Sequence, residues 1–454
     1  MNDFQKRIYT IILSVSIMIS ASTSLSAKPD SAAEITRRCK ISVSSGDVKV
    51  LSDKKMSTFW ACQSGESSIK VDIPNEISVA GIMVDWFKEP KGYNIAAKDQ
   101  MGKVLNAYSL SDRFGSIRDY FVVDKNVKSI TISKLGTEDK VSEITIYSTG
   151  ALPKDVQIWE SPVNKADLMV ICAHQDDEFL FMGGAIPYYQ GEKNLVVFYM
   201  ANCGRTRRGE ALDGLWTIGM HNYPVFACFP DVRTKTLQQC MDAWGNEKAV
   251  EILVKNIRKF KPDVIVTHDE NGEYGHGAHS FTAYAVKKAV EKSADPDQYR
   301  ESAQQYGAWQ VKKLYLHLYN KNQIQLDWNK PMTKFDGYTA LEMASIGFSK
   351  HVSQQKNHSM KEGILYDNQK FGLAFTAVGL DSKKDDFFEN IIKTENKPLQ
   401  DVRVSIEQKK KSTSASTLSK NETRSQNYNK LIQAVAIFLL AIAFLLAYRK
   451  NTRP

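Results

Sequence analysis

Five short, continuous apolar runs constrain the fold of this 454-residue chain more than any other feature. They are LMVICA (168–173), LVVFYM (195–200), VFACF (225–229), DVIVTH (263–268) and KLYLHLY (313–319). Runs without polar alternation are typical of parallel strands buried on both faces. Helix-like segments lie near 206–220, 244–260 and 279–292, and a further one lies around 338–357. This order predicts a Rossmann-like, doubly wound, mostly parallel α/β sheet over residues 160–395.

A different pattern precedes this sheet. Residues 38–150 contain short alternating runs, such as SSIKVDI and KSITISKL, separated by turn signals such as KEPKGY. Short strands at this spacing predict an all-β sandwich. The segments STFWACQS, GIMVDWFKEPKGYNIAAKDQMGK and KSITISKLGTEDKVSEITIYSTG resemble discoidin-like, galactose-binding-type domains. The resemblance implies binding to a sugar or a surface. Trp60, Trp86 and Tyr93 are candidates for stacking on a ligand, with a place in the core as the alternative.

Both ends of the chain look like membrane signals. Residues 1–27 place two basic residues before the apolar stretch IYTIILSVSIMIS, as in a secretory signal peptide, with an uncleaved anchor as the alternative. Residues 405–430 are rich in Lys, Ser, Thr, Asn and Gln and predict a flexible stalk. Residues 431–448 are apolar except for Gln433, long enough to nearly cross a bilayer core of ~30 Å, and precede a basic tail. A buried globular helix is the alternative. We therefore predict a single C-terminal transmembrane helix and an extracytoplasmic ectodomain.

Charge and cysteine usage narrow the class of protein further. The formal net charge of +9 is modest for this length, and much of it lies near the C-terminus. No basic stripe lies on a predicted domain, so we do not expect a nucleic-acid partner. The six cysteines fit an exported protein loosely: Cys39 could pair with Cys62 and Cys228 with Cys240, and free buried thiols are the equal alternative.

Charged loops follow two of the predicted strands. HQDDE (174–178) follows the first strand, and DENGEYGHGAH (269–279) follows the strand that ends at His268. In open α/β sheets, ligands bind beyond the carboxyl ends of the strands. We therefore expect the two loops to converge, with a solvated charged turn as the alternative.

The residue types in these loops suit a metal ion. A set of imidazoles and a carboxylate with one open position is typical of catalytic zinc, which makes hydroxide available near neutral pH. The loops contain more carboxylates than a metal needs, so one remains to act as a base.

The stretches AHQDDE and NGEYGHGAH resemble the two motifs of the LmbE/PIG-L-type deacetylases, which are zinc enzymes that remove acetyl groups from N-acetylglucosamine-containing substrates. The resemblance extends over about 165–390. It implies that His174, Asp177 and His279 bind zinc, although another divalent transition metal also suits such a donor set.

The same resemblance assigns further roles. It implies that Asp176 is the general base, that His276 is a general acid or stabilises the oxyanion, and that Tyr274 polarises the substrate carbonyl. Asp269 is expected to orient a histidine from behind the metal. His268 is expected to have a similar supporting role or to pack in the core.

Three other features belong to the same comparison. Gln175 stands where the family usually has proline, which removes a fixed φ and is expected to loosen the turn. Gly277–Ala278 replace a frequent Pro-Asp, and neither change removes a ligand. Within NCGRTRRGE, the arginines and in particular Arg205 and Arg208 are candidates to bind a sugar or an anionic group, with a solvated basic loop as the alternative.

These expectations define one function and two alternatives. We expect a membrane-tethered zinc amidohydrolase that deacetylates an N-acetylglucosamine-type glycan or glycoconjugate. One alternative is a zinc hydrolase of another amide or acyl substrate. The other is a non-catalytic surface protein that binds glycans.

Overall fold

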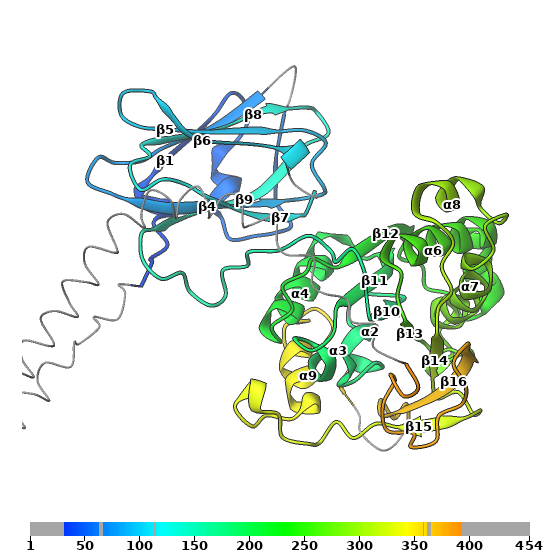
Figure 1. Cartoon of the computed structure of the whole chain (residues 1–454). Helices are drawn as coiled ribbons and strands as arrows, with labels where there is room; N and C mark the ends of the chain where they lie inside the picture. The colour runs from blue at the N-terminus through cyan, green and yellow to red at the C-terminus, as the bar shows by residue number, and fades with distance from the viewer. Residues whose placement is uncertain (1–30, 63–66, 113–114, 357, 361–364, 392–454) are drawn as a thin grey trace, which may run out of the picture. The chain divides into compact units, whose positions relative to one another are not determined.

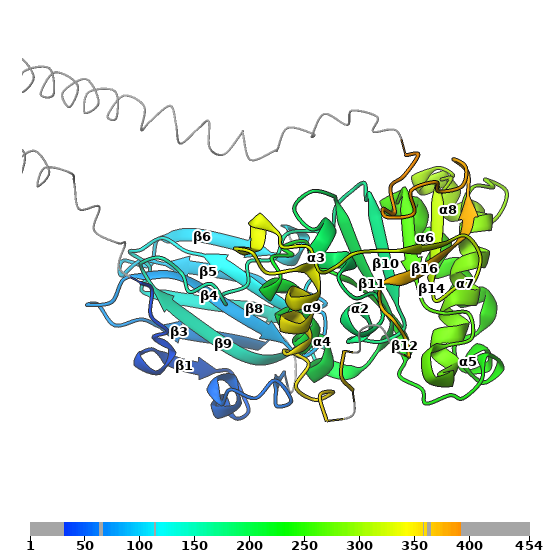
Figure 2. The ribbon, with the colours of Figure 1, turned by 90° about the horizontal axis from the view of Figure 1, so that it is seen from below.

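The computed structural model describes residues 31–62, 67–112, 115–356, 358–360 and 365–391 (Figures 1 and 2). The predicted signal peptide (1–27), stalk (405–430) and transmembrane helix (431–448) lie outside the described residues. Within the described ranges, no helix combines the length and the apolar character that a membrane span requires.

The first part of the described chain is a β-sandwich, as the alternating pattern predicts. One sheet has the order β1-β3-β8-β5-β6, with bounds Lys40–Val43, Ser67–Asp72, Ser129–Leu135, Asn94–Lys98 and Val104–Ser109. The other has the order β2-β9-β4-β7, with bounds Trp60–Ala61, Lys140–Ser148, Val79–Trp86 and Arg118–Val122. Trp60, Trp86 and Tyr93 are 2%, 0% and 2% exposed, so they belong to the sandwich core and cannot stack on a ligand as the structure stands.

The second part is built on a seven-stranded sheet of order β12-β11-β10-β13-β14-β16-β15. The five predicted strands form its parallel portion: β10 (Leu168–Cys172), β11 (Leu195–Asn202), β12 (Val225–Pro230), β13 (Val264–Thr267) and β14 (Lys313–His317). Two antiparallel strands, β16 (Lys370–Thr376) and β15 (Gln323–Gln325), extend it and were not predicted. The doubly wound sheet is therefore mixed at one edge.

Helices cover both faces of this sheet (Figures 1 and 2). One face packs on α2 (Asp177–Leu180), α3 (Ala185–Tyr189), α4 (Gly204–Thr217) and α9 (Ala340–Phe348). The other packs on α5 (Leu237–Trp244), α6 (Asn246–Phe260) and α7 (Gly277–Ser293), and α8 (Arg300–Tyr306) packs on α6.

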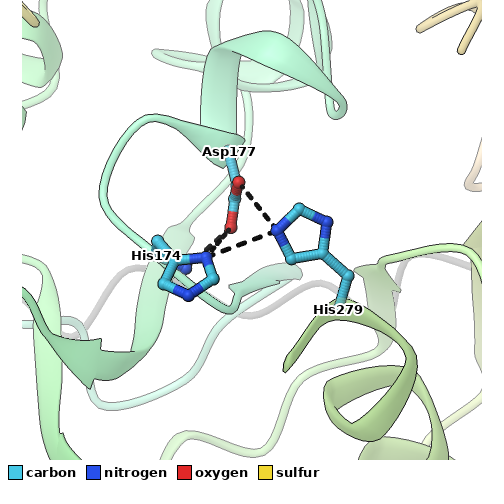
Figure 3. A group of neighbouring side chains, drawn as sticks. All are labelled: His174, Asp177 and His279. Carbon is cyan, nitrogen blue, oxygen red and sulfur yellow. Dashed lines mark hydrogen bonds and ion pairs between the residues drawn. The ribbon is translucent and has the colours of Figure 1, made fainter. Parts of the chain in front are cut away.

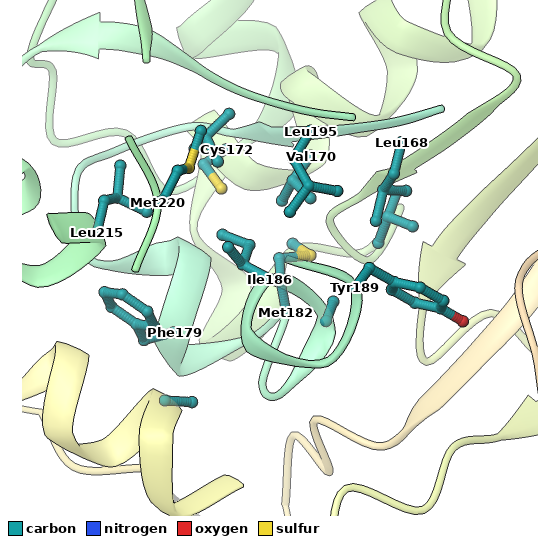
Figure 4. Packing of buried hydrophobic residues seen from close by; sticks show 14 of the residues in the cluster. Leu168, Val170, Cys172, Phe179, Met182, Ile186, Tyr189, Leu195, Leu215 and Met220 are labelled. Carbon is teal, nitrogen blue, oxygen red and sulfur yellow. The ribbon is translucent and has the colours of Figure 1, made fainter. Parts of the chain in front are cut away.

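Burial on both faces of strand β10 explains why its sequence is apolar without alternation. Leu168, Val170 and Cys172 belong to the core on one face, which Figure 4 shows from close by. Met169 and Ile171 belong to the core on the other face. Both sets are fully buried, and each large apolar side chain contributes about 1.5–3 kcal/mol to folding.

One prediction about local structure was wrong. The helix expected to reach residue 357 ends at Phe348, and His351, beyond that end, bonds to buried Glu178 at 2.8 Å. The six cysteines are free, so neither candidate disulfide is formed and the alternative of free thiols holds. The thiol of Cys62 donates to Ser67 Oγ at 2.9 Å. In the second pair, Cys228 is exposed on β12 whereas Cys240 is buried on α5, so their side chains face different environments.

Candidate metal centre and active site

The two charged loops meet at the point where the strand order of the sheet reverses. Strand β10 is the first strand of this sheet along the chain, and it lies between β11 and β13. His174 follows β10 and His268 follows β13. The crevice at such a switch point is where open α/β sheets bind their ligands.

Three buried donor atoms converge there (Figure 3). His279 Nε2 lies 3.3 Å from His174 Nδ1, and it lies 3.4 Å from Asp177 Oδ1. His174 Nδ1 lies 3.4 Å from Asp177 Oδ2. The side chains come from the β10–α2 turn and from the first turn of α7, so folding of the sheet brings them together.

These separations fit a zinc-like ion. Bonds of about 2.0–2.1 Å to a tetrahedral centre place neighbouring ligand atoms about 3.3–3.4 Å apart. The two imidazole nitrogens lie 3.3 Å apart, and each lies 3.4 Å from a different oxygen of Asp177. His279 and His174 are also 0% and 5% exposed. The donor set therefore has the chemistry and the close spacing that three ligands of one ion require.

A fully buried carboxylate, Glu273, lies behind this set. Its Oε2 is 2.8 Å from Nδ1 of both His268 and His279, and its Oε1 is 2.7 Å from Nδ1 of His317. The backbone N–H of Asp269 donates to the same Oε1 at 3.1 Å. Burial alone raises the pKa of Glu273, but the three histidines outweigh burial and hold that pKa well below its usual range.

Glu273 fixes the orientation of one candidate ligand. His279 donates its Nδ1 proton to the carboxylate, so Nε2 presents its lone pair toward His174 and Asp177. A carboxylate behind a ligating imidazole sets the tautomer and raises ligand basicity. Asp177 is held in the charged form that a metal ligand needs. Burial raises its pKa, but His279 and His268 lower that pKa well below the usual range.

Asp176 occupies a strained backbone position beside the donor set. Its φ is 131°, in a region that non-glycine residues rarely adopt. Its N–H donates to Glu178 at 2.8 Å, and Arg207 Nη2 donates to its Oδ1 at 2.8 Å. Burial and Asp177 raise the pKa of Asp176 well above its usual range, while Arg207 acts against them. Strain of this kind persists only where several contacts hold it.

His276 and Tyr274 lie beside the donor set, with ring centroids 4.6 Å and 5.4 Å from that of His279. The ring centroids of His276 and His174 are 4.8 Å apart. Ala278 N–H donates to His276 Nδ1 at 3.2 Å, which leaves the proton of the neutral ring on Nε2. Burial, His279 and His174 lower the pKa of His276 to about 3, so the ring is neutral near pH 7. Tyr274 has a φ of 48°, and its side chain is partly exposed.

The donor set opens into a cavity of about 790 Å³. His174, Asp176, Asp177, Tyr274 and His276 form one side of it. The rest of the wall includes Arg207, the segment 231–235 apart from residue 232, and Ser353, Gln354 and His358. The space is large enough for a sugar-sized ligand.

The structure does not bring Arg205 and Arg208 to this cavity. Arg205 donates to Asp85 Oδ1 at 2.6 Å and to Trp86 O at 2.8 Å, and Arg208 pairs with Glu89. Both guanidinium groups therefore bind the β-sandwich, where buried Asp85 and partly exposed Glu89 compensate their charge. Arg207, which lies between them in the sequence, lines the cavity instead.

The remaining predicted residues support the site from behind. Ala173 N–H donates to His268 Nε2 at 2.9 Å, which ties β13 to β10. Asp269 accepts from Asn271 N–H at 3.0 Å and closes a turn, so it does not orient a histidine with its side chain. Gln175 donates to Ala201 O at 2.7 Å and accepts from Cys203 N–H at 3.2 Å, so hydrogen bonds hold the turn where proline was expected.

Sequence reasoning missed four supporting residues. Glu273 and Glu178 are buried carboxylates inside the two motifs, and His317 and His351 are their distant partners. The position of Glu273 between Gly272 and Tyr274 gave no signal of burial. His317 ends an apolar run, which was the one available hint that it points inward.

The family model described as PIG-L: GlcNAc-PI de-N-acetylase matches residues 169–290. These residues therefore form a PIG-L/LmbE-type deacetylase domain, which contains all three donor residues.

Curated relatives match the same region. A mycothiol S-conjugate amidase of Streptomyces coelicolor is 42% identical over 89 residues, which is 19% of this chain and 27% of that protein. A 1D-myo-inositol 2-acetamido-2-deoxy-alpha-D-glucopyranoside deacetylase of Catenulispora acidiphila is 27% identical over 188 residues, 34% of this chain and 56% of that protein. The chain thus spans little more than half of these relatives at most.

The comparison with solved structures also returns matches that are the size of the β-rich N-terminal region. A CBM32 module of Clostridium perfringens, solved with GlcNAc-alpha-1,4-galactose, matches at 15% identity with a TM-score of 0.22, and the match covers 28% of this chain and 99% of the module. The discoidin-like assignment of the sandwich stays a prediction.

Proposed function

We propose that this protein is a metal-dependent deacetylase that removes acetyl groups from an N-acetylglucosamine-type glycan or glycoconjugate. The observation that carries the proposal is the donor set itself. The two imidazoles lie 3.3 Å apart, each lies 3.4 Å from one oxygen of the Asp177 carboxylate, and His174 and Asp177 line a sugar-sized cavity. His174, Asp177 and His279 would hold the ion, which we propose is zinc.

The bound ion would supply Lewis-acid chemistry, lowering the pKa of a water and polarising the amide carbonyl. Asp176 accepts the proton of the attacking water. The carboxylate lies beside Asp177 at the cavity wall, and Arg207 holds its Oδ1. The water oxygen bonds to the carbonyl carbon, and the carbonyl oxygen takes up negative charge.

Two groups can stabilise that oxyanion. His276 carries a proton on Nε2, because Nδ1 accepts from Ala278 N–H. Tyr274 keeps its phenolic proton, since burial and Asp177 raise its pKa. Both can donate a hydrogen bond toward negative charge that develops in the cavity.

The leaving amine needs a proton when the carbon–nitrogen bond breaks. A neutral His276 with a pKa of about 3 is a poor source of that proton. We therefore propose that Asp176 returns the proton it accepted, so that acetate and a free amine leave. His276 then serves as a hydrogen-bond donor and not as the general acid.

The N-acetylglucosamine part of the proposal is supported by names of similar proteins. One relative is named as a deacetylase of a 2-acetamido-2-deoxy-glucopyranoside conjugate. Another relative is named as an amidase of mycothiol S-conjugates, and this observation favours cleavage of a different amide as the second candidate function.

Acetate release distinguishes these candidates. The full-length chain, loaded with zinc, is incubated with a panel of N-acetylglucosamine-containing glycans and glycoconjugates, and released acetate and free amine are both quantified. The proposal predicts equal amounts of the two products. Asp176→Asn should lose at least about 10²-fold in kcat, because the proton acceptor is gone, while zinc content stays at the wild-type value. A zinc-loaded protein that frees amine without acetate favours the amidase. A protein that binds zinc but cleaves no substrate contradicts the proposal.

We also propose that the enzyme acts outside the cytoplasm, tethered by one C-terminal helix. The support is the sequence pattern of residues 1–27 and 431–448. Protease added to intact expressing cells should cleave the catalytic domain while the protein stays in the membrane fraction. Protection of that domain in intact cells would contradict this orientation.

A further inference from the structure

The charged side chains of helix α4 bind two different parts of the protein. Arg205, Arg208 and Asp213 bind the β-sandwich or the linker that follows it. Arg207 binds the turn that contains Asp176. At 100° per residue, positions 205, 208 and 213 fall on one side of a helix and position 207 falls opposite. The helix therefore stands between the sandwich and the candidate catalytic turn.

The sandwich side of this helix is held by ionic contacts in which the arginines and Asp85 are buried, whereas Glu89 and Asp213 are partly exposed. Asp85 Oδ1 accepts from Arg205 Nη2 at 2.6 Å and from Arg118 Nε at 2.7 Å. Arg118 also reaches Asp213 on α4 at 2.6 Å. Glu89 receives both terminal nitrogens of Arg208, one of them at 3.2 Å. Asp85, Arg118, Arg205 and Arg208 are at most 6% exposed. Separating buried ion pairs leaves uncompensated charge, so these contacts resist movement of the helix.

The opposite side of the helix reaches the strained turn. Arg207 Nη2 donates to Asp176 Oδ1 at 2.8 Å and to Gln175 O at 2.7 Å. One guanidinium group thus holds the carboxylate and the peptide next to it, at a residue whose φ is 131°. A displacement of the first turn of α4 would move the group that holds Asp176 in place.

We propose that the β-sandwich is a structural part of the active site, because it positions Asp176 through α4 and Arg207. Arg207 is a positioning residue, and Glu89 and Asp85 act through it. The kinetic consequence rests on the proposed deacetylase function. Sugar binding by the sandwich is not required for this role.

The test is a double-mutant cycle in the full-length, zinc-loaded protein. Glu89→Ala removes a sandwich anchor that does not line the cavity. We expect it to lower kcat about tenfold with little change in KM, because small misplacements of a catalytic group have effects of this size. Arg207→Met should lower kcat by about 10²-fold. The double variant should be no slower than Arg207→Met alone, because Glu89 acts through Arg207.

Glu138→Ala is the matched control. It removes an exposed ion pair with Lys88 in the same domain, at 2.6 Å, that includes no residue of α4. This control should retain wild-type kcat. Arg207→Lys should recover part of the loss of Arg207→Met, since an ammonium keeps the charge but not the two-pronged geometry.

Amide hydrogen exchange supplies a readout that does not depend on activity. Glu89→Ala should speed exchange in the peptides that cover 174–178 and 204–210, whereas Glu138→Ala should not. Multiplicative losses in the cycle, together with unchanged exchange at 174–178, overturn the proposal. If the wild-type chain releases no acetate, the proposed function fails, and the exchange experiment decides the linkage by itself.

Discussion

Replacing Glu273 by glutamine is the sharpest test of how the metal centre is built. The carboxylate accepts four hydrogen bonds, from Nδ1 of His268, His279 and His317 and from Asp269 N–H. An amide of the same shape offers one oxygen in place of two. It keeps an acceptor for His279, but it removes the negative charge, and its NH₂ group must face the side of His317 and Asp269.

The magnitude follows from these contacts. Loss of a carboxylate behind a metal-binding histidine lowers metal affinity by about 10–100-fold, or about 1.4–2.7 kcal/mol. In the variant, the Asp269 N–H faces another donor and loses its hydrogen bond. This loss should lower the free energy of unfolding of the metal-free protein by about 1–3 kcal/mol. Glu273→Gln should therefore weaken zinc binding and lower the metal-free melting temperature.

Zinc affinity is measured by competition with a chelating indicator, and stability by urea unfolding of the chelator-treated protein. Glu270→Gln is the control, since Glu270 lies in the same loop but pairs with Lys287 at the surface at 3.0 Å. A zinc Kd for Glu273→Gln within twofold of the Glu270→Gln value would refute the argument that this carboxylate orients His279 for the metal.

Three further outcomes are expected. Burial raises the pKa of Glu143 in β9 to about 7 from its usual 4.5, so the folded protein loses stability as pH rises from about 4.5 to 7. Glu143→Gln should therefore raise the free energy of unfolding by about 1–3 kcal/mol at pH 8 and by much less at pH 5, as measured by urea titration. Gly347→Ala would place a Cβ 2.5 Å from the Phe179 ring, so overpacking should lower that free energy by about 1–3 kcal/mol, and a melting temperature equal to wild type would contradict this. Gln175→Ala removes two hydrogen bonds between the catalytic turn and the end of β11, which should cost about 1–3 kcal/mol and speed amide exchange at 174–178; unchanged exchange would count against it.

The parallel sheet could be predicted because its signal is local. The central strands β10 and β13 are buried along their whole length, since helices cover both faces of the sheet there, and this gives their short apolar runs. The short strand β15 alternates exposed Gln323 and Gln325 around one buried residue, too brief a pattern to predict. Strand β16 is recognisable only through its antiparallel pairing with β14, which lies more than fifty residues earlier in the chain. Long-range pairing of this kind leaves little trace in a single sequence.

The candidate site also contains residues that local motifs predict and residues that only the folded structure reveals. His174, Asp177 and His279 lie in motifs, and folding brings them together as predicted. The arginines lie within four residues of one another, so composition could not separate Arg207 from Arg205 and Arg208. Only the direction in which each leaves α4 decides which one reaches Asp176 and which ones reach the sandwich. Burial of Glu273 likewise depends on partners from three separate segments.

Gln175 has a thermodynamic consequence. A proline would order the turn by removing conformations from the unfolded chain, an entropic effect. Gln175 orders it through hydrogen bonds to Ala201 O and Cys203 N–H in the folded state, an enthalpic effect. Enthalpic restraint weakens relative to chain entropy as temperature rises. Asp176 follows directly on this residue, so thermal inactivation should begin with loosening of the turn, at a lower temperature than global unfolding. In a protein with proline at this position, activity and the folded structure would be lost at the same temperature.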